Sequence, residues 1–185
     1  MEGSLAGKLL IAMPQMGDPR FEHAVILMCL HGPEQAMGLI LNKPRPLRLG
    51  DVLSHLEIRM SGDVSSRAVL FGGPVKEDRG YVLHSDDFFI EEATQVVTPG
   101  IGLTATREVL ESLSGNHPPR QFVLALGYAG WGPGQLEDEL AQNAWLIADP
   151  EDAIVFDEDF DHKWVRAIKQ LGIHPSQIMG DAGRA

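Results

Sequence analysis

Two apolar runs joined by a short polar loop place the strongest constraint on the fold. Residues 24–30 and 36–41 are apolar, and His31, Gly32, Pro33, Glu34 and Gln35 separate them. This pattern predicts two antiparallel strands that form a hairpin. Side chains of a strand alternate between the two faces of its sheet, so a run that is apolar at every position buries both faces. We therefore expect this hairpin to lie in the centre of a sheet.

Apolar periodicity predicts the other elements. Short apolar or β-branched runs between turn residues indicate strands at 9–13, 68–71, 81–84, 88–90, 94–97, 122–126 and 145–148. Apolar residues spaced at i, i+3, i+4 and i+7 indicate helices near 49–56, 106–113, 136–144 and 161–171. We expect Thr104 to cap the second of these helices and Gly115 to end it. Hairpins alternate with strand–helix–strand units, which favours an α+β domain over a doubly wound sheet.

Length and charge restrict the class of protein. A chain of 185 residues without a repeat or a linker-like segment predicts a single domain over 1–185. Its 15 basic and 26 acidic residues give a net charge of −11, which repels nucleic-acid phosphates and anionic lipid. The apolar runs are shorter than a membrane helix, and one cysteine, Cys29, cannot form an internal disulfide or a cysteine-based zinc cluster. We expect a cytoplasmic protein with no membrane contact, no direct nucleic-acid binding, no metal and no cofactor.

The glycine-rich segment 127–135 lies between a predicted strand and a predicted helix, where phosphate-binding loops occur. It lacks a Gly-Lys-Ser/Thr ending, and Gln135 stands where a dinucleotide fingerprint that starts at Gly130 requires Gly or Ala. The acidic residues that follow would repel a phosphate. We therefore interpret the segment as a tight connector in which glycines adopt positive φ and Trp131 closes the core. An exposed Tyr128 and Trp131 would instead form a binding surface.

Two short patterns contain catalytic residue types. Cys29 and His31 share a face of their predicted strand, but a cysteine in a central strand is more often a small buried hydrophobic residue. His84, Ser85 and Asp86 are the residue types of a hydrolase triad, yet neighbours on a strand point to opposite faces. His84 is instead interpreted as a hydrogen-bonded histidine at a strand end. These residue types still allow an alternative function, a hydrolase with His84 as the base and Ser85 or a water as the nucleophile. That hypothesis requires a cleft in which His84 is exposed.

Two charged segments have weaker implications. The segment 157–162 places Asp at the first, third and fifth positions of a calcium loop, but the sixth and twelfth positions lack the required Gly and Glu. We interpret it as an acidic cap on the helix that follows. Lys43, Arg45 and Arg48 form a compact basic patch, and three cations support at most a modest, salt-dependent contact with nucleic acid. The histidines show no His-x-x-x-His spacing typical of a metal site.

Several segments together carry a family resemblance: Leu5–Pro14, Asp18–Phe21, Met37–Pro44, Gly72–Val75, Arg79–His84, Leu103–Thr104, Gly127–Gln135 and Asn143–Trp145. On these segments the chain resembles the bacterial YqgE/AlgH family over nearly its whole length. The run Gly-Tyr-Ala-Gly-Trp-Gly-Pro-Gly-Gln-Leu-Glu from Gly127 is the most distinctive. The chain departs from the family pattern at Gln35, where Gly is common, and at Asp181, where a C-terminal histidine is usual.

The resemblance implies a single α+β domain whose mixed β-sheet is bifurcated, partly barrel-like and surrounded by helices. It implies no catalytic residue, and the family name carries a suggested link to transcriptional regulation of exopolysaccharide synthesis. Our leading hypothesis is a cytoplasmic binding or regulatory module that works through a protein or small-molecule partner. Polar and glycine-rich strand ends commonly form sites. The candidate binding surface comprises Asn42, Gly72, Gly73, Pro74, His84, Gly127, Tyr128, Gly130, Trp131, Gly134 and Gln135.

Overall fold

The computed structural model describes residues 3–59, 63–115 and 117–179, so Asp181 lies outside the described residues. The strands are β1 (Leu9–Ala12), β2 (Val25–His31), β3 (Ala36–Ile40), β4 (Pro44–Arg48), β5 (Ala68–Phe71), β6 (Val75–Ser85), β7 (Thr94–Thr98), β8 (Ile101–Thr104), β9 (Phe122–Trp131) and β10 (Trp145–Ala148). The α-helices are α1 (Leu49–His55), α2 (Arg107–Leu113), α3 (Gln135–Ala141), α4 (Asp152–Phe156), α5 (Lys163–Gln170) and α6 (Pro175–Met179).

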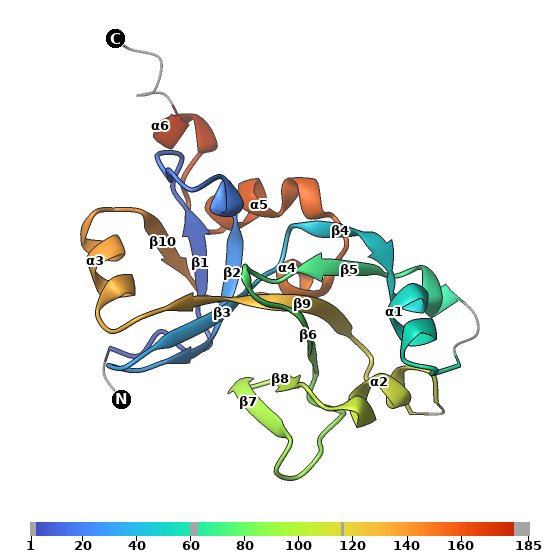
Figure 1. Ribbon diagram of the computed structural model, residues 1–185. Helices are drawn as coiled ribbons and strands as arrows, with labels where there is room; N and C mark the ends of the chain where they lie inside the picture. The colour runs from blue at the N-terminus through green and yellow to red at the C-terminus, as the bar shows by residue number, and fades with distance from the viewer. Residues whose placement is uncertain (1–2, 60–62, 116, 180–185) are drawn as a thin grey trace.

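In this described part ten strands form one sheet, in the order β10-β1-β2-β3-β9-β6-β8-β7, with β4 and β5 as a branch (Figure 1). The predicted hairpin is confirmed, since β2 and β3 pair antiparallel with Leu27 opposite Leu39. β2 lies between β1 and β3, as its two apolar faces predict. Its alternate residues enter two different cores: Leu27 lies in one and Ile26 in the other.

The sheet divides in two along β9. One edge of β9 pairs with two strands in turn: with β5, in parallel, near Leu124, and with β3, antiparallel, near Ala129. The other edge of β9 pairs with β6. Gly72 lies at the fork, where its N–H donates to the Leu126 carbonyl at 2.9 Å and its carbonyl accepts from the Ile40 N–H at 2.9 Å. These bonds join both branches to one strand, which confirms the mixed, bifurcated sheet.

Six neighbouring strands of the sheet, β2-β3-β9-β6-β8-β7, curl until β7 approaches β2. This part of the sheet is therefore barrel-like, as expected. A β-bulge between Met28 and Leu30 turns the end of β2. At this bulge the Gln95 side-chain Nε2 donates to the Cys29 carbonyl at 2.6 Å. A side-chain hydrogen bond therefore links β7 to β2, where no strand ladder is formed between the described residues.

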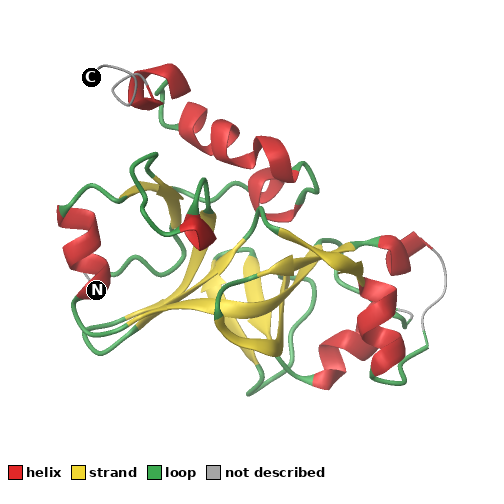
Figure 2. Ribbon diagram, turned by 45° about the horizontal axis from the view of Figure 1, so that its top comes forward, coloured by secondary structure: helices red, strands yellow, loops and turns green. Residues whose placement is uncertain are grey.

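Helices cover the sheet on several sides (Figure 2). α1 and α2 pack over β5, β6 and β9 through Leu53 and Val109, while α3 covers the core around Trp131 and Trp145. α4 and α5 cover β1 and β2, where the Trp164 indole donates to the Ala12 carbonyl at 2.8 Å. No helix in the described part is both long and apolar enough to cross a membrane.

Some predicted elements are wrong. Residues 88–90 form no strand, because the N–H groups of Ala93 and Thr94 close a turn on the Ile90 carbonyl. Thr104 ends the unpredicted strand β8, and Thr106 occupies the N-cap of α2. The unpredicted β4 contains two prolines, which an edge strand tolerates.

The connector predicted at 127–135 is also largely wrong, because β9 continues to Trp131 and the turn before α3 is confined to 132–134. A high density of glycine normally marks a loop, but here it accompanies close packing of β9 against the chain that links β5 to β6.

Candidate functional site

The predicted glycines pack backbone against backbone. A Cβ atom on Gly72 would lie 2.3 Å from the Gly127 carbonyl oxygen, and one on Gly73 would lie 2.0 Å from the Tyr128 carbonyl carbon. Gly127 adopts φ +78°, and a Cβ atom added to it would lie 2.3 Å from the Gly73 carbonyl oxygen. These contacts bring two predicted segments together at the fork of the sheet and leave no space for side chains.

Beside this contact lies a cleft of about 420 Å³, which we call the Glu139 cleft. Four predicted residues line it: Pro74, Gly130, Trp131 and Gln135. The cleft also contains side chains from the segment before β2, from α3 and from the start of β10: Gln15, Met16, Asp18, Arg20, Phe21, Glu139, Gln142, Ala144 and Trp145. Three segments distant in the sequence therefore form it.

Glu139 is the polar centre of this cleft. Its Oε1 accepts from the indole Nε1 of Trp131 and from that of Trp145, each at 3.1 Å. Its Oε2 accepts from the side-chain amide of Gln135 at 3.3 Å, and the Gln135 Oε1 in turn accepts from the Gly132 N–H at 3.1 Å. These bonds fix a partly exposed carboxylate in one orientation.

Aromatic rings support this carboxylate. Trp131 and Trp145 are 5% and 4% exposed, and their rings meet edge to face with centroids 6.1 Å apart. Phe21 adds a second edge-to-face contact to Trp145, at 6.1 Å. The prediction that Trp131 closes a core is therefore confirmed. Because the rings are held by one another, they give the cleft a rigid wall.

An ion pair stands at the side of the Glu139 cleft. The Arg20 guanidinium donates to the Asp18 carboxylate at 2.6 Å, and this hydrogen bond holds the Asp18 pKa below its ordinary value. The two charges neutralise each other, so Glu139 supplies the uncompensated charge among the lining residues in the described part. A ligand that donates hydrogen bonds or carries positive charge suits such a cleft.

The sequence pointed to only part of this cleft. Trp131 and Gln135 were predicted, but Glu139, Trp145 and Phe21 were not assigned to the candidate surface. The Gln135–Glu139 spacing is i, i+4, which places both on one helical face. That spacing, together with a tryptophan on each side of the helix, was the available signal.

Two other predicted residues do not reach the cleft lining. Tyr128 points to the other side of β9, where its ring meets that of Tyr81 edge to face at 5.9 Å. Gly134 is the N-cap of α3 with φ +73°.

Asn42 occupies a different place and ties two chain segments together. Its Oδ1 accepts from the Val25 N–H at 3.0 Å, and its Nδ2 donates to the His23 carbonyl at 2.7 Å. It borders a separate cavity of about 410 Å³, together with Lys43 and Trp164. Its amide is therefore already bonded on both sides.

His84 is buried with 0% exposure, so the prediction of a cleft that exposes it is wrong. Its Nδ1 bonds to the Ser85 carbonyl at 2.9 Å and its Nε2 to the Thr104 hydroxyl at 2.8 Å. Burial lowers the His84 pKa, which favours the neutral ring. His84 pairs with Phe122 at the start of β9, about 30 Å along that strand from Trp131 at ~3.3 Å per residue.

The Ser85 hydroxyl is directed elsewhere. Its Oγ donates to the Asp87 carboxylate at 2.5 Å and lies 3.3 Å from the Gln121 carbonyl. Within the described part of the chain it makes no hydrogen bond to the His84 ring, so the two residues do not form a nucleophile–base pair.

Cys29 is 1% exposed, and burial raises its pKa to about 12. The interpretation of Cys29 as a buried hydrophobic residue is therefore confirmed. Among the residues that the structure describes, no three His, Cys, Asp or Glu side chains are grouped to hold a metal ion.

The basic residues at 43, 45 and 48 differ in their surroundings. Burial alternates along β4, so Arg45 is partly covered while Arg48 is exposed. The Lys43 ammonium donates to the Glu22 carbonyl at 2.7 Å.

The acidic segment 157–162 makes specific contacts rather than a simple helix cap. Asp157 pairs with Arg166, and His162 bonds to Asp159 at 2.7 Å.

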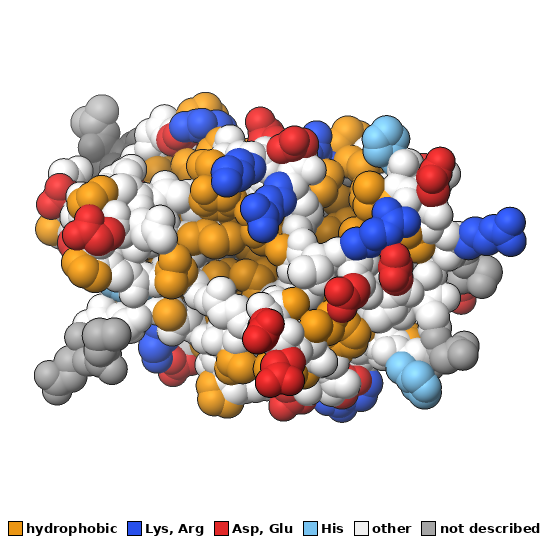
Figure 3. Space-filling model, turned by 60° about the horizontal axis from the view of Figure 1, so that its bottom comes forward, with side chains coloured by type: hydrophobic (Ala, Val, Ile, Leu, Met, Phe, Trp, Pro, Cys, Tyr) orange, Lys and Arg blue, Asp and Glu red, His pale blue; other side chains and the backbone are white. Residues whose placement is uncertain are grey.

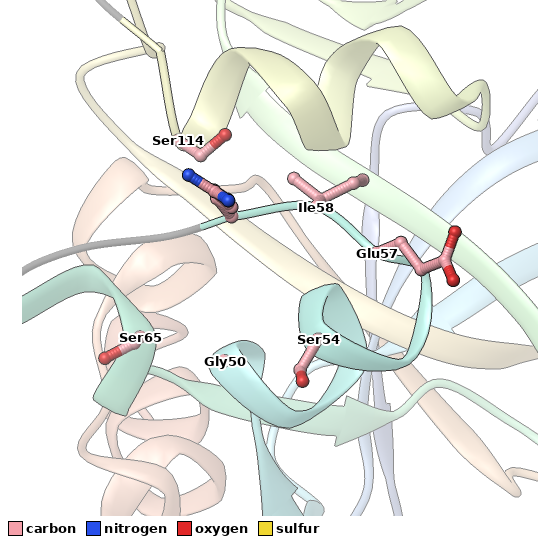
Figure 4. A pocket seen from close by; sticks show the side chains of 7 residues that line it. Gly50, Ser54, Glu57, Ile58, Ser65 and Ser114 are labelled. Carbon is pink, nitrogen blue, oxygen red and sulfur yellow. The ribbon is translucent and has the colours of Figure 1, made fainter.

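A wider cavity of about 880 Å³ lies between α1 and the end of α2 (Figure 4). Its walls carry Ser54, Glu57, Ile58 and Ser114, and none of the predicted site residues lines it.

Fold and site together define a class: a forked, half-closed α+β sheet whose glycine-rich central strand ends in a tryptophan–glutamate cleft. A model of the AlgH-like family matches residues 9–176, and the chain belongs to this family.

Bacterial relatives are similar in sequence to this chain over nearly its full length. A UPF0301 protein of Caulobacter vibrioides is 48% identical over 98% of this chain and 94% of its own, and one of Ruegeria pomeroyi is 49% identical over 98% and 99%. The solution structure of the AlgH protein from Pseudomonas aeruginosa matches with a TM-score of 0.79 at 34% identity, covering 100% of this chain and 98% of that one. A Corynebacterium diphtheriae protein of known structure shares the fold, with a TM-score of 0.73 at 18% identity over 90% and 87% of the two chains.

Proposed function

We propose that this protein is a cytoplasmic regulatory module that binds a protein or small-molecule partner in the Glu139 cleft. Membership of the AlgH-like family supports a regulatory role through the link that the family name suggests. The net charge of −11 favours action through a partner over direct contact with DNA.

The observation that carries the proposal is the orientation of the Glu139 carboxylate by two indole N–H groups. Such donors fix an acceptor without neutralising it, because an indole carries no charge. A ligand with an ammonium or guanidinium group would gain a charge-assisted hydrogen bond to Glu139. It would also contact the apolar side chains of Met16 and Pro74 in the same cleft.

Tryptophan fluorescence tests the proposal, because Trp131 and Trp145 both line the cleft. The probes are the N-acetyl amides of arginine, lysine, glutamine and glutamate, which carry no α-ammonium group. We expect the arginine and lysine amides to shift the emission and the glutamate amide to have no effect. Glu139→Gln keeps an oxygen acceptor for the indoles but removes the charge, so it should weaken binding by about 1.5–3 kcal/mol, roughly tenfold or more.

Asp138→Asn is the matched control, since it makes the same charge change on the same helix outside the cleft lining. Binding to this variant should equal that of the wild type. If none of the four amides changes the emission, or if Glu139→Gln binds as tightly as Asp138→Asn, the Glu139 cleft is not the binding site.

A further inference from the structure

Another concave surface lies between α1 and α2, on a part of the molecule that the proposed function does not use. A cavity of about 340 Å³ opens there above β6 and β9. An adjoining cavity of about 210 Å³ shares Leu56, Gly80 and Leu110 with it. We call the two together the α1–α2 groove. On the side toward which α2 lies in Figure 1, hydrophobic side chains line hollows between charged ones (Figure 3).

Aliphatic side chains form most of this groove. Leu47, Val52, Leu56, Leu110 and Leu126 all line it, and each is only partly buried while packing on the core beneath α1 and α2. Five incompletely covered aliphatic residues in one concave place make an apolar surface that a partner can cover. Scattered exposed apolar residues would have no such implication.

Gly80 keeps the floor of the groove open. A Cβ atom there would lie 3.3 Å from Leu124 Cδ1 and 3.7 Å from Leu126 Cδ2, both at the ends of flexible side chains. A larger side chain at position 80 would therefore occupy the cavity rather than collide with the backbone. The Thr106 hydroxyl adds a buried polar atom in the adjoining cavity that has no hydrogen-bond partner among the described residues.

The charge at the rim of the larger cavity is negative. Asp51 and Asp78 both border the larger cavity, with His55 beside them. Asp51 accepts a hydrogen bond from the Arg48 backbone N–H at 2.8 Å, and neither carboxylate forms an ion pair with any residue in the described part. Arg107 at the far end is already paired with Glu111 at 2.9 Å. Arg79, at the smaller cavity, forms no ion pair in the described part either, so the uncompensated acidic charges lie at the larger cavity and are these two carboxylates.

We propose that the α1–α2 groove docks a basic segment of a partner protein, with leucine- or isoleucine-type side chains in the groove and an adjacent lysine or arginine at Asp51 and Asp78. The aliphatic lining supplies the apolar contact and the two carboxylates supply charge complementarity. A net charge of −11 adds long-range attraction for such a segment. The groove is separate from the Glu139 cleft, so this proposal does not depend on the proposed function.

The probe is the peptide acetyl-Lys-Leu-Leu-Lys-Leu-Lys-amide, followed by NMR of the leucine methyl groups. We expect shifts at Leu56, Leu110 and Leu126. Two counterparts, with every Leu replaced by Ala or every Lys by Glu, should bind roughly tenfold or more weakly, because each loses one of the two contributions. Octylammonium tests whether the ligand is a small cationic amphiphile rather than a protein segment. It should bind more weakly than the peptide.

Variants locate the site. Gly80→Val fills the cavity, and Asp51→Asn combined with Asp78→Asn removes the rim charge from two exposed positions while keeping the acceptor for Arg48. Both should weaken peptide binding roughly tenfold, whereas Asp138→Asn, which lies outside the linings of the groove and of the Glu139 cleft, should leave it unchanged. If Gly80→Val does not fold, peptide binding to the Asp51→Asn, Asp78→Asn double variant still tests whether the site lies at the rim of the groove.

Three results would overturn the proposal. Equal binding of the basic and acidic leucine peptides would show that the carboxylates do not recognise the charge of the peptide. Equal binding of the leucine and alanine peptides would show that the apolar groove does not bind the leucine side chains. Octylammonium binding as tightly as the peptide would assign the groove to a small cationic amphiphile instead of a protein segment.

Discussion

At the scale of single residues, Lys163 shows a charge that the fold compensates poorly. Its side chain is 0% exposed, yet its ammonium donates a long hydrogen bond to the Val155 carbonyl at 3.4 Å and lies 3.7 Å from Asp157. Burial lowers the Lys163 pKa to about 8, against the attraction of Asp157. Asp157 pairs with Arg166 as well, so its charge is shared between two cations.

We predict that Lys163→Met stabilises the protein at pH 7. In the wild type the folded pKa of about 8 lies below the ordinary 10.5, so between these values the unfolded chain binds a proton that the folded chain does not. The free energy of unfolding of the wild type should therefore rise with pH through this window, relative to the variant. At pH 7 the variant should be more stable by about 1–3 kcal/mol, and the difference should shrink toward pH 10.

Urea unfolding of both proteins at several pH values measures this difference, and groups other than Lys163 titrate equally in the two. A variant less stable than the wild type at pH 7 would mean that the contacts with Asp157 and Phe160 outweigh the cost of burial.

Other single residues mark how far the sequence can be interpreted. The burial of Cys29 followed from a run that is apolar at every position. The interpretation of His84 as a hydrogen-bonded histidine at a strand end is confirmed, but its partner Thr104 was not predicted, because it is 20 residues away and lies in a strand that the sequence pattern did not reveal. A histidine in a strand looks the same to a pattern whether it faces a cleft or a buried hydroxyl.

At the scale of elements, β9 explains why glycine was misleading. Glycine permits both loops and close backbone contacts, and the sequence pattern cannot tell these uses apart. Here Gly72, Gly73 and Gly127 meet where the chain that links β5 to β6 crosses β9. The fork in the sheet depends on this crossing, since Gly72 bonds to both β3 and β9.

We predict that Gly73→Ala destabilises the protein by more than about 3 kcal/mol, because its Cβ would lie 2.0 Å from backbone atoms that cannot move independently. Gly132→Ala is the control: it lies just beyond β9 with nothing within 4 Å of the added Cβ, and it should change stability by less than about 0.5 kcal/mol. Urea unfolding followed by circular dichroism compares the two. Similar stability of the two variants would show that the crossing can relax.

At the scale of the whole molecule, local patterns predicted most of the strands and helices but not their long-range assembly. The Glu139 cleft joins residues from positions 15–21, 74 and 130–145, and no periodicity relates these segments. The barrel-like curl was expected from the family resemblance alone. The hydrogen bond at its closure joins Gln95 and Cys29, which are 66 positions apart in the sequence.

This closure leads to a prediction about the stability of one half of the molecule. β7 has one strand neighbour, β8, in the described part, and the Gln95 side chain bonds its free edge to the bulge of β2. Gln95→Ala should remove that bond and leave the Cys29 carbonyl without its partner, lowering the free energy of unfolding by about 1 kcal/mol. The loss should be local, because the ladder that joins β1, β2 and β10 does not involve β7.

Amide hydrogen exchange distinguishes a local from a global effect. We expect faster exchange in β7 and β8 of Gln95→Ala, with β1 and β10 unchanged from the wild type. Gln142→Ala serves as the control, since this exposed side chain on the end of α3 makes no hydrogen bond to the described residues. Uniformly faster exchange would mean that β7 and β10 unfold as one unit and that the curled sheet behaves as a single cooperative structure. Unchanged exchange in β7 would instead assign the closure to apolar packing of Val97 in the core, with the hydrogen bond contributing little.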